Sequence, residues 1–389
     1  MPGMDVFGAE ERHEVNEVLE TGCLFRYNHE HIRQDRWKVR ELEAETRKYT
    51  SASYAHAVSS GSTAVAAAMA ASGLGFGDEI IVPPFTYIAT IEGVLLGGGL
   101  PVFAEIDENL CLTAEGIEKV ITPKTKGVML VHMCGASADM DSILAVCEKY
   151  NLKLLEDAGQ ALGAFYKGKS VGLFGEAGAF SLDFFKIITA GEGGLCITNS
   201  EKISNYIEQF SDHGHSHLGS NRGMEAHPIL GTNFRLSELH AAVGLAQIRK
   251  LKDIRDRKRH NHAYLISRLS EVKEIRFRPV PDKEGDSGTF VNFFLPTQAL
   301  AQQTSKNLAA AGIGVNYWFT NMYHFINQWD HLKKLESPFK MAIHHLGAPQ
   351  DYSNLDIPIS QDVVGRLISV GTKVTWTKEE MDKLADQMI

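Results

Sequence analysis

The 389-residue sequence lacks several patterns that would assign it to common protein classes. It has no Lys/Arg-rich block and a formal net charge of −9, so neither nucleic acid nor an anionic membrane is an expected partner. Its five cysteines have no CxxC spacing, which favours free thiols over a disulfide framework. No apolar run reaches membrane-spanning length, and the first fifteen residues do not read as a signal peptide. We therefore expect a cytoplasmic protein.

Motifs for nucleotide and DNA binding are missing as well. No Gly-x-Gly-x-x-Gly follows the first predicted strand, and there is no Walker lysine. Both absences disfavour a dinucleotide-dependent oxidoreductase or a nucleoside triphosphate as ligand. A DNA-binding regulator would need a helix-turn-helix segment, and none is readable here.

From about residue 55, short apolar runs such as EIIVPP, GVMLVHM and LKLLEDA alternate with helical patterns. Strands with little internal polarity, separated by helices, predict an α/β sheet that is mostly parallel and covered on both faces. After a long helical stretch that starts at NFRLSELH, the composition shifts toward a smaller α+β unit. We predict a large domain over residues 1–250, including an N-terminal segment 1–45, and a smaller domain over residues 251–389.

One lysine stands in an unusual setting. Lys186 lies between Phe184, Phe185, Ile187 and Ile188, and lysine is rarely buried without a partner. Burial disfavours the charged form of an amine, so an apolar setting would lower the pKa of this lysine. Lysines with a lowered pKa can act as Schiff-base nucleophiles.

Three other segments supply parts that fit such a lysine. Residues 60–63 begin a helix and could bind a phosphate, although an ordinary N-cap is an equally simple interpretation. Asp157 ends a predicted strand, where ligands of α/β sheets bind, and Tyr87 follows another strand. Either residue alone could serve packing or capping. Together with Lys186 they are the parts that pyridoxal 5′-phosphate needs: a phosphate anchor, an aromatic face, an acid for the ring nitrogen and an amine.

Six motifs then carry a family resemblance: SSGSTAV, GDEIIVPPFTYIAT, PVFAEID, EDAGQALGA, FSLDFFKIITAGEGG and GTNFRLSELHAAVGLAQI. In order and register they resemble the DegT/DnrJ/EryC1/StrS family of sugar aminotransferases. The resemblance implies the fold type I of pyridoxal-phosphate transferases, with a mixed, mostly parallel seven-stranded sheet covered by helices and a smaller α+β C-terminal domain. It also implies a homodimer with active sites at the subunit interface, to which segment 1–45 contributes.

The same resemblance assigns roles to individual residues. Lys186 would bind the cofactor covalently, and Asp157 would hold its ring nitrogen. Asn233 would reach the cofactor of the neighbouring subunit. In family members that dehydrate sugars a histidine replaces the lysine, so Lys186 implies transamination. The remaining cofactor-binding positions implied by the resemblance are Gly61, Ser62, Thr63, Tyr87, Gln160 and Ser181.

The substrate is also suggested by resemblance. The segments FRYN, DRWK, HMCG, FSDHGHSHLG and AHPILGTNFRLSE resemble the branch that forms 8-amino-3,8-dideoxy-manno-octulosonate (Kdo8N) for lipopolysaccharide, by amination of an oxidised sugar acid at C8 with L-glutamate as donor. One alternative is an aminotransferase acting at C3 or C4 of a nucleotide-linked keto-hexose, and a more distant one is a non-catalytic, cofactor-binding regulator. A sugar carboxylate needs a cation, for which the candidates are Arg26, Arg33, Arg36 and Arg222.

Several other side chains are candidates for contact with the substrate. His213, His215 and His217 could bind zinc on a strand, but no cysteine or carboxylate cluster completes such a set, so we expect no metal. We expect instead a loop in which His213 or His215 faces the sugar. His324 could line the same pocket or pack in the core, and Glu192 could shape the turn after Lys186.

Overall fold

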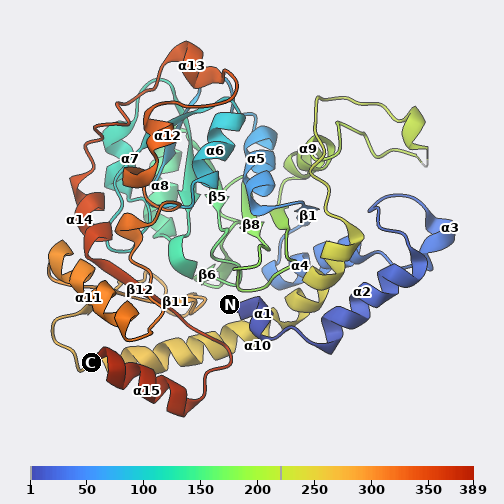
Figure 1. Ribbon diagram of the computed structural model, residues 1–389. Helices are drawn as coiled ribbons and strands as arrows, with labels where there is room; N and C mark the ends of the chain where they lie inside the picture. The colour runs from blue at the N-terminus through green and yellow to red at the C-terminus, as the bar shows by residue number, and fades with distance from the viewer. Residues whose placement is uncertain (1, 220) are drawn as a thin grey trace.

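The computed structural model describes residues 2–219 and 221–389, and a seven-stranded sheet lies at its centre (Figure 1). In spatial order the strands are β1 (Tyr54–Val58), β9 (Gly194–Thr198), β8 (Ala177–Ser181), β5 (Lys153–Asp157), β4 (Thr125–Val131), β2 (Glu79–Val82) and β3 (Leu100–Phe103). Neighbouring strands are parallel except at β9, which runs antiparallel to both β1 and β8. The predicted mixed, mostly parallel sheet is confirmed.

Helices connect and cover these strands. They are α1 (Pro2–Asp5), α2 (Ala9–Thr21), α3 (Glu30–Arg33), α4 (Lys38–Thr50), α5 (Gly61–Ala71), α6 (Ala89–Leu96), α7 (Ala114–Val120), α8 (Met140–Tyr150), α9 (Glu201–Phe210) and α10 (Glu238–Leu269). α5 packs on β8 and β9 beside α6 and α9, whereas α8 packs on β5 beside α7. No helix within the described residues is long and apolar enough to cross a membrane.

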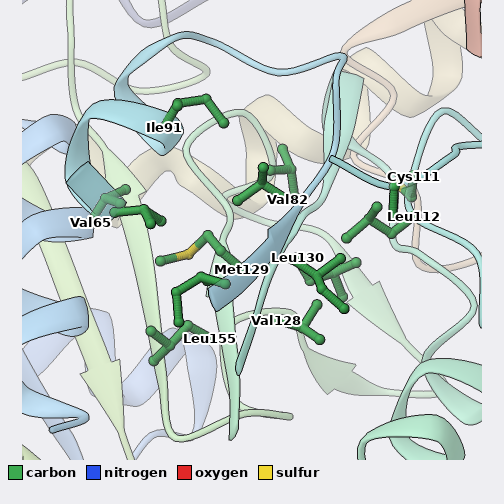
Figure 2. Packing of buried hydrophobic residues seen from close by; sticks show 14 of the residues in the cluster. Val65, Val82, Ile91, Cys111, Leu112, Val128, Met129, Leu130 and Leu155 are labelled. Atoms are coloured by element: carbon green, nitrogen blue, oxygen red, sulfur yellow. The ribbon is translucent and has the colours of Figure 1, made fainter. Parts of the chain in front are cut away.

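The short apolar runs of the sequence become the core. Every residue of β2, β3, β8 and β9 is buried, which is expected of strands covered on both faces. Figure 2 shows Val82, Met129 and Leu155, from three neighbouring strands, packed with Val65 of α5 and Ile91 of α6. All five cysteines are buried and free.

A second, smaller sheet follows α10. Its strands β10 (Arg276–Phe277), β11 (Phe290–Phe294) and β12 (Leu367–Gly371) are antiparallel, and α11 (Gln298–Ala310), α14 (Pro358–Arg366) and α15 (Lys378–Met388) accompany them. The expected smaller α+β unit is therefore confirmed. α10 runs without a break through residue 250, so the division into residues 1–250 and 251–389 stays a prediction.

Part of the C-terminal segment returns to the large sheet. Trp318, Phe325 and Trp329 belong to the same buried cluster as the strands of that sheet. The backbone of residues 323–326 pairs with residues 84–88, which follow β2. The short helices in this segment are α12 (Asp330–Lys333) and α13 (Ala342–Leu346). This return brings the C-terminal third of the chain to the carboxyl ends of the strands.

A buried carboxylate of β5 links the end of β4 to the loop that precedes β8. Glu156 of β5 is 1% exposed and accepts hydrogen bonds from the backbone amides of Gly172 (2.7 Å), Phe174 (2.6 Å) and Gly175 (2.7 Å). His132 Nε2 lies 2.9 Å from it, and Nδ1 of the same ring accepts from a backbone amide, so Nε2 carries the proton. Glu156 thereby fixes the loop that leads into β8.

Replacement of this carboxylate should destabilise the fold. We expect Glu156→Ala to lower the free energy of unfolding of the cofactor-free protein by about 3–5 kcal/mol, because buried donors lose their acceptor. Denaturant titration measures this value. Glu115→Ala, at an exposed position, is the control and should change it by less than about 0.5 kcal/mol. Equal effects of the two substitutions would contradict the structural role of Glu156.

Candidate active site

The predicted site residues meet at the carboxyl ends of adjacent strands. Asp157 is the last residue of β5 and Ser181 the last residue of β8, and these strands are parallel neighbours. Gly61 begins α5 just beyond the end of β1, and a Cβ atom added to it would lie 2.6 Å from Cβ of Ser181. Lys186 follows Ser181 after a short turn. The sheet therefore collects, at one edge, side chains that are far apart in sequence.

The start of α5 is built as an anion site. Ser60 caps the helix by accepting from the amide of Thr63 (3.1 Å), and the Thr63 hydroxyl accepts in turn from the amide of Ser60 (2.9 Å). The amides of Gly61 and Ser62 have no acceptor in the described part of the chain. These free amides and the positive end of the helix suit a phosphate. The Thr63 hydroxyl is used by the cap itself.

The amine of Lys186 is partly buried. Burial lowers its pKa, and the carboxylates of Asp157 and Asp183 act in the opposite direction without cancelling that effect. Within residues 2–219 and 221–389, no side chain forms a hydrogen bond with Nζ. The apolar setting inferred from the sequence is only half correct, because the rings of Phe184 and Phe185 are exposed. The amine is thus available for chemistry.

Asp157 is held firmly. Its Oδ2 accepts a hydrogen bond from the Thr90 hydroxyl (2.6 Å), and its Oδ1 accepts one from the amide of Gly159 (2.9 Å). The side chain is 9% exposed. Neither bond was expected from the sequence, although Thr86 and Thr90 stand four residues apart in FTYIAT, the spacing that places side chains on one face of a helix.

Gln160 and Tyr87 border the same region. Gln160 Oε1 accepts a hydrogen bond from the amide of Cys134 (3.2 Å). The ring of Tyr87 is 42% exposed, and its centroid lies 5.4 Å from that of His324. Partial burial raises the pKa of Tyr87, with further contributions from nearby carboxylates that include Glu192. Glu192 is exposed close to the site.

His324 comes from the returning C-terminal segment and faces the lysine. Burial, and then the positive charge of Lys186, lower its pKa to about 4. Its Nδ1 lies 2.8 Å from Oδ1 of Asn321, and its ring packs edge-on against Trp318. Both interpretations from the sequence therefore apply, since this histidine is packed and also borders the site.

The other predicted substrate contacts are engaged elsewhere in the described chain. Arg26 is 4% exposed and donates to Glu43 (2.8 Å) and to the carbonyl of Ala57 (2.7 Å). Arg33 pairs with the buried Glu238 (3.2 Å). Arg36 pairs with Glu20 and Glu17 on the surface.

The loop after α9 is organised around Asp212. Arg222 donates two hydrogen bonds to it (2.7 and 2.9 Å), and Arg235 donates a third. Burial acts to raise the pKa of Asp212, but these hydrogen bonds more than offset that effect and hold the pKa below its usual value. His217 Nε2 lies 3.5 Å from the same carboxylate. Asn233, whose backbone pairs with Asp212, is exposed.

The two remaining histidines of this loop differ in exposure. His213 is exposed, and its backbone adopts a left-handed conformation (φ 56°). His215 is buried, with Nδ1 3.2 Å from the carboxylate of Glu225 and its ring beside His227. Among the described residues, no group of three or more His, Cys, Asp or Glu side chains could hold a metal ion.

Comparison with known proteins supports an aminotransferase site. The chain is 34% identical over 273 residues to GDP-perosamine synthase of Vibrio cholerae, covering 68% of this chain and 70% of that protein. It is 37% identical over 262 residues to the spore coat polysaccharide biosynthesis protein SpsC of Bacillus subtilis, covering 66% of this chain and 65% of that one. The crystal structure of an aminotransferase from Psychrobacter cryohalolentis superimposes with a TM-score of 0.83 at 27% identity, covering 98% of this chain and 96% of the other.

The match to a protein family extends over almost the whole chain. The family model described as the DegT/DnrJ/EryC1/StrS aminotransferase family matches residues 6–389, which include the cap of α5, the end of β5, the lysine turn and the returning C-terminal segment. On this match, and on the arrangement of those elements at one edge of the sheet, the chain belongs to the DegT/DnrJ/EryC1/StrS aminotransferase family.

Proposed function

We propose that this sugar aminotransferase moves an amino group from L-glutamate to the C8 aldehyde of an oxidised 3-deoxy-manno-octulosonate (Kdo), in lipopolysaccharide synthesis. The observation that carries amine transfer is the Lys186 amine, which has a lowered pKa and lies beside Asp157 at the ends of β5 and β8. The sugar is suggested by the segments FRYN, DRWK, HMCG and FSDHGHSHLG, which resemble the Kdo8N branch.

Pyridoxal 5′-phosphate is the cofactor, and the residues at the site fit it. The free amides of Gly61 and Ser62 and the hydroxyl of Ser181 would hold its phosphate, because no Cβ at position 61 narrows the space against Ser181. Asp157 would accept a hydrogen bond from the protonated ring nitrogen, and Lys186 would bind the aldehyde. When bound, the cofactor supplies an electron sink and carries the amino group between the two substrates.

Lys186 performs the proton transfers in this proposal. Because burial lowers its pKa, the amine loses its own proton more readily than an exposed lysine does, and Nζ can then take the proton from Cα of glutamate. His324 assists, since with a pKa of about 4 it stays uncharged and does not repel the developing ammonium. Tyr87, whose ring lies beside His324, and Gln160, which accepts from the amide of Cys134, would orient the cofactor ring.

A second sugar substrate is favoured by a specific observation. The similarity to a GDP-perosamine synthase suggests a nucleotide-linked keto-hexose, aminated at C3 or C4. The two substrates differ in the anionic group that the protein must bind: a carboxylate on the sugar acid, or a diphosphate on the nucleotide sugar.

We expect the purified protein to aminate 8-oxo-Kdo with L-glutamate as donor. The amination rate with GDP-, UDP- or dTDP-linked keto-hexoses should be at least about 100-fold lower, because a site that pairs with a polar group of its substrate discriminates strongly against substrates that lack that group. Formation of 2-oxoglutarate and mass spectrometry of the amino sugar measure this preference. The reverse preference would assign the second function instead, and no amination of any of these sugars would contradict both.

Lys186→Ala should remove turnover completely, because the protein then lacks the amine that moves the proton. The visible absorbance that pyridoxal 5′-phosphate acquires on binding should also change, while the unfolding transition of the cofactor-free protein stays within a few degrees. Lys202→Ala, at an exposed position in α9, is the control and should retain full activity. Normal turnover by the Lys186 variant would contradict the mechanism.

We also propose a homodimer in which Asn233 of each subunit contacts the cofactor phosphate in the other. Co-expression of Lys186→Ala and Asn233→Ala subunits should then restore up to about a quarter of wild-type activity, because only the mixed dimer contains one intact site. Co-expression of Lys186→Ala with the doubly substituted chain is the control and should restore none. Equal activity in both mixtures would contradict a shared site, and light scattering would report the oligomeric state directly.

A further inference from the structure

Two buried threonines lie behind Asp157, and the cofactor contacts described above do not use them. Thr86 is 1% exposed and Thr90 is not exposed at all. Their hydroxyl oxygens lie 2.6 Å apart, and the Thr90 hydroxyl is also 2.6 Å from Oδ2 of Asp157. The three side chains form a continuous line of short hydrogen bonds.

The direction of these hydrogen bonds follows from proton counting. A carboxylate oxygen only accepts, so the single hydroxyl proton of Thr90 is donated to Asp157. Thr90 then has no proton left for its neighbour, and Thr86 must donate to the Thr90 oxygen. Both hydroxyl dipoles therefore point toward the carboxylate, and each strengthens the next.

The hydroxyl of Thr90 does not bond as the hydroxyls of buried threonines inside a helix often do, because the carbonyl four residues before Thr90 precedes the start of α6. Such hydroxyls commonly bond to the carbonyl four residues earlier in their own helix, as Thr46 does with Leu42 (2.8 Å) and Thr50 does with Thr46 (2.8 Å) in α4. Thr90, in the first turn of α6, instead reaches across to β5. Its hydroxyl thus serves the carboxylate rather than its own helix.

The other carboxylate oxygen is fixed independently by the amide of Gly159 at 2.9 Å. Rotation of the carboxylate would break both hydrogen bonds in a buried environment, where unmade hydrogen bonds are costly. The threonines are anchored in turn, because the amide of Thr86 donates to the carbonyl of His324 (2.9 Å). The returning C-terminal segment therefore supports the whole line.

We propose that Thr90, supported by Thr86, is a positioning residue that sets the orientation of Asp157 before the cofactor ring arrives. The inference rests on the proposed function, in which Asp157 holds the ring nitrogen. Without the Thr90 hydroxyl, Oδ2 loses the donor that fixes it, and the carboxylate is free to rotate about its remaining hydrogen bond to Gly159. A misaligned Asp157 would stabilise the protonated ring nitrogen less, and the ring would become a weaker electron sink.

The test compares Thr90→Val, Thr90→Ser and Thr86→Val with Thr46→Val, which removes a buried hydroxyl far along the chain in α4. Each protein is loaded with pyridoxal 5′-phosphate labelled with nitrogen-15 in the ring, and the ring-nitrogen chemical shift is followed against pH. The rate of a single turnover with L-glutamate alone is measured in parallel. Denaturant unfolding of the cofactor-free variants reports any purely structural loss.

We expect the ring nitrogen of Thr90→Val to lose its proton at lower pH than in the wild type. The single-turnover rate should fall about 10- to 100-fold, as misplacing a reacting group does, with the glutamate concentration at half-maximal rate within about twofold. Thr90→Ser should recover the rate to within about threefold, since it restores the donor. Thr86→Val should give a smaller loss, and Thr46→Val none despite a comparable loss of stability.

An unchanged ring-nitrogen shift in Thr90→Val, with a rate equal to that of Thr46→Val, would overturn the positioning role and leave the proposed function standing. Failure of Thr90→Ser to recover either readout would overturn it as well. A wild-type protein that binds no pyridoxal 5′-phosphate would instead contradict the proposed function, and the role of Thr90 with it. The three results are therefore distinguishable.

Discussion

The parallel pairing of β5 with β8 is the constraint on which the site depends. Successive residues of a strand point to opposite faces of the sheet, so the side chains of Glu156 and Asp157 at the end of β5 have different surroundings. Glu156 faces the buried loop that leads into β8 and fixes it through backbone amides, and this loop sets where Ser181 ends its strand. Asp157 faces the site. One buried carboxylate thus holds the scaffold while its neighbour is available for chemistry.

Burial at the site favours the uncharged form of the Lys186 amine. Burial lowers the pKa of Lys186, and two carboxylates oppose it only in part. His324 lies close enough that the charge of Lys186, after burial, contributes to lowering its pKa. The lysine comes from the turn after β8 and the histidine from the returning C-terminal segment. The surroundings of the amine are therefore assembled from distant parts of the chain.

Most of the sheet could be predicted from the sequence, because strands buried on both faces leave continuous apolar runs, and β2, β4, β5, β8 and β9 all lie in such runs. The placement of Asp157 at a strand end followed from the rule that ligands bind at the carboxyl ends of strands, whereas the role of Ser181 beside it was implied only by the family resemblance. His324 was a candidate for the pocket, but the choice between pocket and core could not be made from the sequence, since it depends on a segment that folds back over the sheet. The Thr90–Asp157 hydrogen bond likewise depends on the exact register between α6 and β5, which no local pattern records.

The ion pairs of Arg26 and Arg222 determine which of these arginines could bind the carboxylate of a sugar acid at lower cost. Freeing Arg26 would leave Glu43 unpaired in a largely buried setting, and breaking a buried pair costs about 3–5 kcal/mol. Arg222 is more exposed, and its partner Asp212 would keep a hydrogen bond from Arg235 if Arg222 turned to a substrate. The cost of re-pairing is then smaller than for Arg26, because Asp212, although buried, keeps one cationic partner. A carboxylate on the sugar would thus be met at lower cost by Arg222, whereas Arg26 is better suited to holding the N-terminal segment against β1.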